Sequence, residues 1–270
     1  MTLTHNNYFT KDNKYLSNSK INDWNICKNY FYRKHITGEL VEEKTDAMLV
    51  GSAVDNILTD LNNFQNGKYA VRQFNGTTKE GKAETLELKE QGLTILTQAK
   101  YDDIMGMAVA VSETTAYKEL KDHTAQEILQ VDMLIGDHFL GLCGVPDWFK
   151  IDGDTCIITD LKTAKTVDDK RYYYHAREYG YMRQMAFYSL MLATLYPDIK
   201  SFVYRHIVVN KHRNVWLVKS FDFEPREIDN ERLKLIKAID DISNEKEFKK
   251  QDATWENATR LVDPNSVELV

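Results

Sequence analysis

The chain has 270 residues, of which 43% are hydrophobic and 28% charged, with twelve Gly and four Pro. This composition excludes collagen-like, low-complexity and mostly disordered proteins, and the length is enough for one large domain with its own core. The formal net charge of −6 provides no overall attraction for a polyanion. Binding of nucleic acid would therefore require local basic patches, divalent metal, or both.

The sequence also indicates a compartment. Its three cysteines, Cys27, Cys143 and Cys156, are too few and too scattered for a disulfide framework or a zinc cluster, and they fit a reducing environment. The first residues lack the basic start and apolar run of a secretory signal, and no stretch approaches the ~20 apolar residues of a membrane helix. We therefore expect a soluble, cytoplasmic protein that does not interact with a membrane.

The first 122 residues are expected to be mainly helical. Apolar residues at helical spacing predict helices over 20–34, capped by Ser17 or Ser19, over 45–64 and over 97–121. Gly51 lies inside the second helix, where it costs about 1 kcal/mol relative to Ala, which indicates close packing or a site. The polar, Gly-containing segment 67–90 predicts a mobile loop.

From residue 123 the pattern changes to strands over 127–134, 139–151 and 155–162, which predict an antiparallel meander. A helix is predicted over 178–195, a strand pair over 201–209 and 215–221, and a helix over 225–248 before an irregular tail. We predict a single α/β domain over 1–270. It comprises a helical part (1–122), a sheet with its following helix (123–222), and a C-terminal helix and tail (223–270).

The triplet Asp160-Leu161-Lys162 stands out by its context. The chain contains nine triplets of the form acid, any residue, lysine, so the triplet alone carries no information. This one ends an apolar β-type run, and another acid, Asp147, lies on the strand before the preceding tight turn. Its context therefore singles it out as a candidate catalytic motif.

The turn decides whether these side chains meet. If it is a type II′ turn at Gly153-Asp154, Asp147 lies opposite Asp160, and Lys162 points to the same face because side chains alternate along a strand. A turn at residues 152–153 would shift the pairing and separate them. Both registers are compatible with the sequence.

Opposed carboxylates have Cβ atoms only about 5 Å apart and repel each other unless a cation lies between them. Oxygen ligands without a nearby His or Cys suit Mg²⁺ or Mn²⁺ rather than zinc. A lysine beside such an ion can position or deprotonate a water, while the ion stabilises charge on phosphoryl oxygens. The pattern therefore predicts metal-assisted phosphodiester hydrolysis; the alternative is a surface hairpin whose acids face solvent.

These residues resemble the PD-(D/E)xK nuclease superfamily, with Pro146-Asp147 and Asp160-Leu161-Lys162 as the two halves of its motif. The resemblance extends over about residues 15–220. It includes an entry segment at 17–31 with Cys27, a Gly51-to-Asp55 element in which Asp replaces the usual metal-binding His of RecB-type nucleases, and a Gln-x-x-x-Tyr motif at Gln184 and Tyr188. The replacement leaves the role of Asp55 open.

The resemblance implies a restriction-endonuclease-like α/β core, with a mixed central sheet and an antiparallel catalytic hairpin flanked by helices. The residue roles it implies are Asp147 and Asp160 as metal ligands, the Leu161 carbonyl as a third ligand, Lys162 as the catalytic lysine, and Asp55 and Glu127 as auxiliary metal acids. Gln184 and Tyr188, at i and i+4 on one helical face, would contact DNA phosphate and orient the lysine.

Within the superfamily, the compact size resembles the stand-alone phage exonucleases of the RecE and lambda type. This implies Mg²⁺-dependent 5′-to-3′ digestion of linear double-stranded DNA in recombination or end processing, in the host cytoplasm if phage-encoded. A ring-shaped homo-oligomer, trimer or tetramer, and a single-strand annealing partner are implied as well. No cysteine follows Cys156, so a four-thiolate iron–sulfur cluster is not expected. A catalytically silent DNA-binding or assembly protein and an endonuclease are the alternatives.

A basic and aromatic stretch follows Lys162. It predicts either a DNA track or 5′-phosphate pocket, or a solvated loop whose tyrosines pack on the domain. Its members are Lys165, Lys170, Arg171, Tyr172, Tyr173, Tyr174, His175, Arg177 and Arg183. Lys28 and Arg33, on the basic side of the first helix, are further DNA-binding candidates. Lys211, His212 and Arg213 are interpreted as a charged turn, with DNA backbone contact as the alternative.

Overall fold

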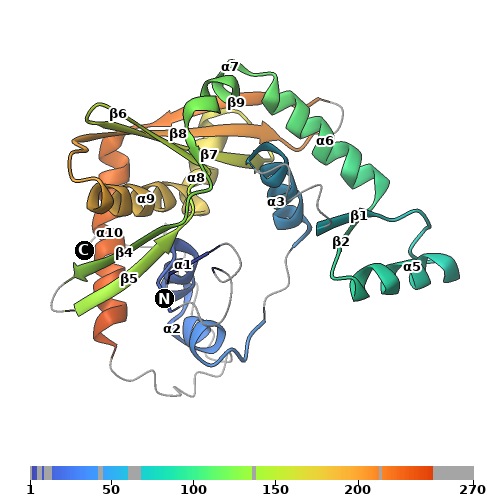
Figure 1. Ribbon diagram of the computed structural model, residues 1–270, viewed down its shortest axis with the longest axis horizontal. Coiled ribbons are helices and arrows are strands. Elements are labelled where there is room, and N and C mark those ends of the chain that lie inside the picture. The colour runs from blue at the N-terminus through green and yellow to red at the C-terminus, as the bar shows by residue number, and fades with distance from the viewer. Residues whose placement is uncertain are drawn as a thin grey trace, which may run out of the picture.

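A five-stranded mixed sheet forms the centre of the protein (Figure 1). The computed structural model describes residues 2–4, 8, 14–41, 45–59, 68–135, 138–212 and 215–245. The strand order is β3 (Thr124–Ala125), β6 (Trp148–Asp152), β7 (Thr155–Ala164), β8 (Ser201–Asn210) and β9 (Val218–Phe223). Strands β7 and β8 are parallel, and the other neighbours are antiparallel. The expected mixed α/β sheet with an antiparallel hairpin is confirmed.

The β6–β7 hairpin has the first of the two predicted registers. Ile151 lies opposite Cys156 and Trp148 opposite Thr159, so the next position pairs residues 147 and 160. Gly153 has a φ of +61°, whereas Asp154 is not among the positive-φ residues. A positive φ at the first central position alone is the signature of a type II′ turn.

Helices cover both faces of this sheet. On one face, alternate β7 residues such as Ile158 pack against α8 (Asp169–Glu178), α9 (Tyr181–Leu195) and α10 (Pro225–Asn244). On the other face, Leu161 packs with α3 (Asp46–Thr59) and α6 (Gln98–Ser112). Figure 1 shows α9 and α10 at the left of the view and α3 and α6 at the right. The centre of β7 is therefore buried on both sides.

The first predicted helix is present but interrupted. Ser17 caps α1 (Asn18–Ile26) by accepting a hydrogen bond from the Lys20 N–H, and α2 (Lys28–Phe31) continues into the π-helical turn η1 (Tyr32–Ile36). Cys27, at the break, has extended backbone with φ −166°. It is half-buried and lies outside both helices, although the predicted helix over 20–34 includes it.

The predicted meander is wrong, because the strand expected over 139–151 is two strands. Strands β4 (Leu129–Ile135) and β5 (His138–Gly144) form a separate antiparallel pair, and the chain leaves strand geometry before β6. Pro146 lies in the break and has no N–H for a ladder. At Gly144 a Cβ would lie 3.0 Å from the Tyr188 ring, so any larger residue would require that ring to shift.

The expected loop over 67–90 is also wrong for most of its length. Strand β1 (Tyr69–Val71) pairs in parallel with β2 (Thr94–Leu96), and α5 (Lys79–Glu90) lies between them in sequence. Thr78 caps α5, and Glu84 accepts the backbone N–H groups of Gln73 and Phe74. These local bonds stabilise a helix that has no apolar face for periodicity to reveal. The three elements form an arm beside α3 and α6 (Figure 1).

Two further segments differ from the elements that the sequence predicts. Residues 169–178, read from the sequence only as a basic stretch, form α8, which Asp168 caps and which buries Tyr172 and Ala176 at i and i+4. The helix predicted over 97–121 is divided into α6, α7 (Thr115–Lys118) and a 3₁₀ turn (Glu119–Asp122).

In the part of the chain that the structure describes, no helix has the length and apolarity to cross a bilayer.

Candidate active site

Asp147, Asp160 and Lys162 meet at the open end of the β6–β7 hairpin. Asp160 is 1% exposed, and its carboxylate forms an ion pair with the Lys162 ammonium, whose side chain is 14% exposed. Apart from this ion pair, neither oxygen of Asp160 has a hydrogen-bond partner. The alternation of side chains along β7 thus places a carboxylate and an ammonium group side by side in the protein interior.

Asp147 is held in place by two neighbours. Its Oδ2 accepts a hydrogen bond from the Leu161 N–H at 2.7 Å, and its Oδ1 accepts one from Gln126 Nε2 at 3.4 Å. Because the N–H and C=O of a strand residue point to the same side, the Leu161 carbonyl also points toward Asp147, beyond the end of β6. This orientation suits the ligand role that the resemblance implies for that carbonyl.

Helix α3 adds a third carboxylate, Asp55. Its Oδ1 is buried without a hydrogen-bond partner. One turn earlier, a Cβ at Gly51 would lie 3.3 Å from Thr163 Oγ1 of β7, so the glycine lets α3 approach the strand that carries the site. Gly51 therefore serves the close packing that its position in a helix predicted.

Burial raises the pKa of all three acids, and like charge adds to this effect at Asp55 and Asp147. Burial, with the charge of Asp160, raises the pKa of Asp55 to about 7. Burial, with Asp55 and Asp160, raises the pKa of Asp147 well above its ordinary value, and burial also raises that of Asp160. For Lys162, burial acts to lower the pKa, but Asp160 and Asp147 outweigh it and the pKa is raised. Lys162 is thus a cation at neutral pH.

The donor set fits a divalent ion. Three carboxylates against one ammonium leave an excess of two negative charges when all four groups are ionised. The orphaned oxygens of Asp160 and Asp55 are hard donors of the kind that Mg²⁺ and Mn²⁺ prefer. No three acid, His or Cys side chains of the described residues lie close enough to form a ready cage. The protein ligands would be two carboxylates and the Leu161 carbonyl, with water completing the shell.

Gln184 and Tyr188 lie on one face of α9, as their spacing predicts. Gln184 Nε2 donates to Tyr188 Oη at 3.0 Å, and Tyr188 Oη donates to the Val145 carbonyl at 3.0 Å. Tyr188 is buried, so it braces the segment before Asp147 from inside. Tyr181, the first residue of α9, places its ring centroid 4.8 Å from Lys162 Nζ. Helix α9 therefore supports both halves of the motif.

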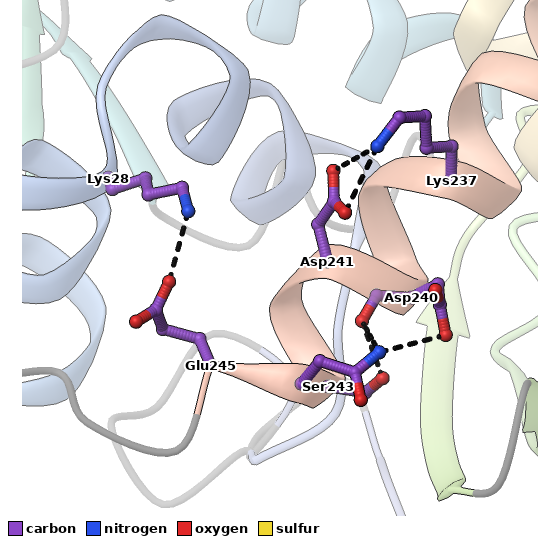
Figure 2. A network of polar contacts seen from close by, with 7 residues as sticks. Lys28, Lys237, Asp240, Asp241, Ser243 and Glu245 are labelled. Atoms are coloured by element: carbon purple, nitrogen blue, oxygen red, sulfur yellow. Dashed lines mark hydrogen bonds and ion pairs between the residues drawn. The ribbon is translucent and has the colours of Figure 1, made fainter.

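Several DNA-binding candidates are engaged elsewhere. Lys28 Nζ pairs with Glu245 at 3.0 Å, at the end of α10 (Figure 2). Arg33 pairs with Glu39, and Arg183 donates to Asn22 of α1 at 2.7 Å. Tyr172 is buried and bonded to His206, which is opposite Asp160 on β8. The exposed members of the basic stretch are Lys165, Lys170, Arg171, Tyr174 and Arg177.

The structure does not bring Glu127 to the carboxylates. It is exposed, precedes β4, and its charge acts on Tyr196. The adjacent Gln126 contacts Asp147 instead. Its side-chain Nε2 donates to Asp147 Oδ1, and its backbone N–H donates to the Asp147 carbonyl. Gln126 also has a φ of +51°, a conformation that costs a non-glycine residue about 1 kcal/mol or more. No signal in the sequence distinguishes Gln126, because glutamine carries no motif and the strained backbone is set by the fold.

Replacing Gln126 by Gly tests this positioning role. We expect unchanged or slightly higher stability, because the strain is relieved, but a roughly 10-fold higher Mg²⁺ concentration for half-saturation of the candidate site, as is typical when an outer partner of a metal ligand is lost. Glu127→Gln is the matched control and should leave the Mg²⁺ dependence unchanged. A shift in the control alone would instead support Glu127 as the auxiliary acid.

Asp55→Asn tests whether the buried Asp55 carboxylate destabilises the folded protein. At a pH well below 3.8, its ordinary pKa, the acid is protonated in both the folded and unfolded states and imposes no penalty. As the pH rises to about 7, only the unfolded state ionises, so the stability of the wild-type protein falls relative to the variant, by at most about 4 kcal/mol. Urea unfolding in EDTA at pH 4, 5, 6 and 7.5 measures the difference. A constant difference at every pH, or an equal trend for Asp46→Asn at the exposed start of α3, would contradict this account.

Comparisons with known proteins agree with this geometry. The family model for a PDDEXK-like domain of unknown function (DUF3799) matches residues 17–258. The crystal structure of a protein titled "Putative exonuclease", from Eubacterium rectale, has a TM-score of 0.66 at 17% identity, covering 97% of this chain and 95% of that one. The expected PDDEXK-like fold is thereby confirmed.

Two further comparisons carry less. The structure of SSO0001 is similar at a TM-score of 0.31 and 11% identity, covering 74% of this chain and 87% of that one, which is too low to support an argument. No curated protein sequence matches the chain.

Proposed function

This chain belongs to the family of PDDEXK-like domains of unknown function, and we propose that it acts as a divalent-metal-dependent deoxyribonuclease. The observation that carries the proposal is the buried meeting of Asp147, Asp160 and Lys162 beside Asp55. A buried excess of negative charge destabilises a protein unless a cation relieves it. Phosphodiester hydrolysis is a reaction that uses such a cation together with an ammonium group.

Each residue has a part that follows from its contacts. Asp147 and Asp160, with Asp55 beside them, would hold a divalent ion, which when bound would supply Lewis-acid stabilisation of phosphoryl oxygens and lower the pKa of a water. Lys162, whose raised pKa keeps it charged, has three N–H donors and no acceptor, so it orients a water or a phosphate oxygen and does not remove a proton. Gln126 and the Leu161 N–H fix the Asp147 carboxylate, and Tyr188 fixes the segment before it.

The finer assignments remain part of this proposal. They are Mg²⁺ as the ion with Mn²⁺ as a substitute, 5′-to-3′ exonuclease action on linear duplex DNA, a homo-oligomeric ring and a single-strand annealing partner. The family motifs support them, and the printed name of the Eubacterium rectale protein is compatible with exonuclease action. The charged Lys162 and the orphaned carboxylate oxygens support the metal dependence directly.

A digestion assay tests the proposal. Linear duplexes with 5′-phosphate ends and closed circular DNA are incubated with the protein in Mg²⁺, in Mn²⁺ and in EDTA. We expect release of nucleotides from the linear duplex in either metal and none in EDTA. DNA binding without hydrolysis would indicate a catalytically silent DNA-binding protein, and cutting of the circle would indicate an endonuclease.

A further inference from the structure

Two lysines lie side by side where β7 and β8 end. Residues 164 and 210 are partners in the parallel ladder, and the Lys211 N–H donates to the Ala164 carbonyl at 2.9 Å. Lys165 and Lys211 therefore follow neighbouring strand ends, and both are exposed. Within the described part of the chain, neither ammonium has an ion-pair partner.

The surroundings of this pair are positive. Partial burial and the charge of Lys165 lower the pKa of Lys211. Burial first, and then both lysines, lower the pKa of His175 on α8, against the opposing effect of Glu178. The acids at the start of α8 are already used: Asp168 caps the helix and Asp169 pairs with Lys219. The two ammonium groups thus repel each other with little to neutralise them, which favours an anion between them.

Aromatic rings connect this cluster to the catalytic lysine. The His175 ring lies 4.3 Å from the Tyr179 ring and 5.6 Å from the Tyr181 ring, centroid to centroid. Tyr181 in turn contacts Lys162 through its ring face. Tyr179 is 58% exposed and lies against the ring of His175, whose pKa both lysines affect. Cations next to an exposed aromatic ring are the combination that binds the backbone and bases of nucleic acid.

We propose that Lys165, Lys211 and His175 form a subsite that binds a phosphate of the nucleic-acid substrate, one aromatic ring away from Lys162. The subsite rests on the proposed function and identifies where the substrate strand lies relative to the catalytic hairpin. It also assigns to Lys211 the role of DNA backbone contact that the sequence left as the alternative to a charged turn. The phosphate is either an internal diester or a terminal monoester, and the test separates the two.

Binding in EDTA tests the subsite independently of catalysis. The affinity of the full-length protein for a labelled duplex oligonucleotide is measured at several salt concentrations, for the wild type, Lys165→Gln, Lys211→Gln and the double variant. Each substitution is expected to weaken binding and to reduce the slope of log affinity against log salt by about 0.9, and the double variant by about twice as much. Duplexes with 5′-phosphate and with 5′-hydroxyl ends are compared.

Lys200→Gln is the matched control, because Lys200 is an exposed lysine just before the opposite end of β8, where it pairs with Asp154. An effect on the 5′-phosphate duplex alone assigns the subsite to a terminal monoester, and an effect on both duplexes assigns it to an internal diester. The subsite would be overturned if the lysine variants had the same slope of log affinity against log salt as the wild type or as Lys200→Gln. It would also be overturned if the wild-type protein did not bind the duplexes at all. A reduced slope in a protein that never hydrolyses DNA would support the subsite and refute the proposed nuclease function.

Discussion

Asp160→Asn is expected to lower metal-dependent DNA hydrolysis by about 10³-fold while leaving the protein folded. The substitution removes a charged oxygen donor from the centre of the site, and loss of one electrostatic contact to the transition state has effects of this size. It also removes a buried carboxylate whose pKa is raised by burial, while Asp147 remains near the Lys162 ammonium, so stability in EDTA at pH 7.5 should not fall. Initial rates on linear duplex, with urea unfolding of the same samples, measure both effects.

Asp152→Asn is the matched control for this substitution. Asp152 is exposed and lies next to the turn of the same hairpin. The control should retain full activity and unchanged stability. An active Asp160→Asn protein, or an inactive control, would show that the hydrolytic site lies elsewhere.

Lys162→Met is expected to have the largest effect on stability. It leaves Asp160 and Asp147 buried without their counter-ion, and breaking a buried pair in this way costs about 3 to 5 kcal/mol. The loss should be greatest at pH 7.5 and smaller at pH 5, because lowering the pH protonates carboxylates whose pKa values are raised. Activity should be lost as well. Urea unfolding in EDTA at the two pH values measures the loss.

A double variant separates charge from packing. Adding Asp160→Asn to Lys162→Met removes the uncompensated carboxylate, so stability should return most of the way while activity stays absent. Lys150→Met, on the neighbouring strand of the same hairpin, should change stability by less than about 0.5 kcal/mol. If the double variant is no more stable than Lys162→Met, the buried charge is not the source of the loss.

The sequence narrows the hairpin to two registers because its information is local. The structure adopts the turn at Gly153-Asp154, and the register that this turn sets places residue 147 opposite residue 160. The alternation of side chains then fixes the face of Lys162. The Gln184–Tyr188 contact follows in the same way from helical spacing.

What the sequence does not predict depends on contacts between distant segments. Gln126 reaches Asp147 only because β3 pairs with β6, and its strained backbone has no signature in composition. The break between β5 and β6 could not be predicted from the sequence, because the packing of Gly144 against Tyr188 is a contact between distant segments. Lys28 and Arg33 appear as free cations in the sequence, but Glu245 and Glu39 pair with them in the fold. Helix α5 was not predicted because it has no apolar stripe. Polar bonds such as the Thr78 cap and the bond to Glu84 stabilise it instead.

Diffraction from crystals soaked in Mn²⁺, with the anomalous signal of the metal recorded, tests the shared-ion claim most directly. We expect one strong peak in contact with the carboxylates of Asp147 and Asp160, near the Leu161 carbonyl, and no such peak in crystals of Asp160→Asn. Absence of a peak there in the wild type, or carboxylates of residues 147 and 160 that point to different sides of the sheet, would contradict the account.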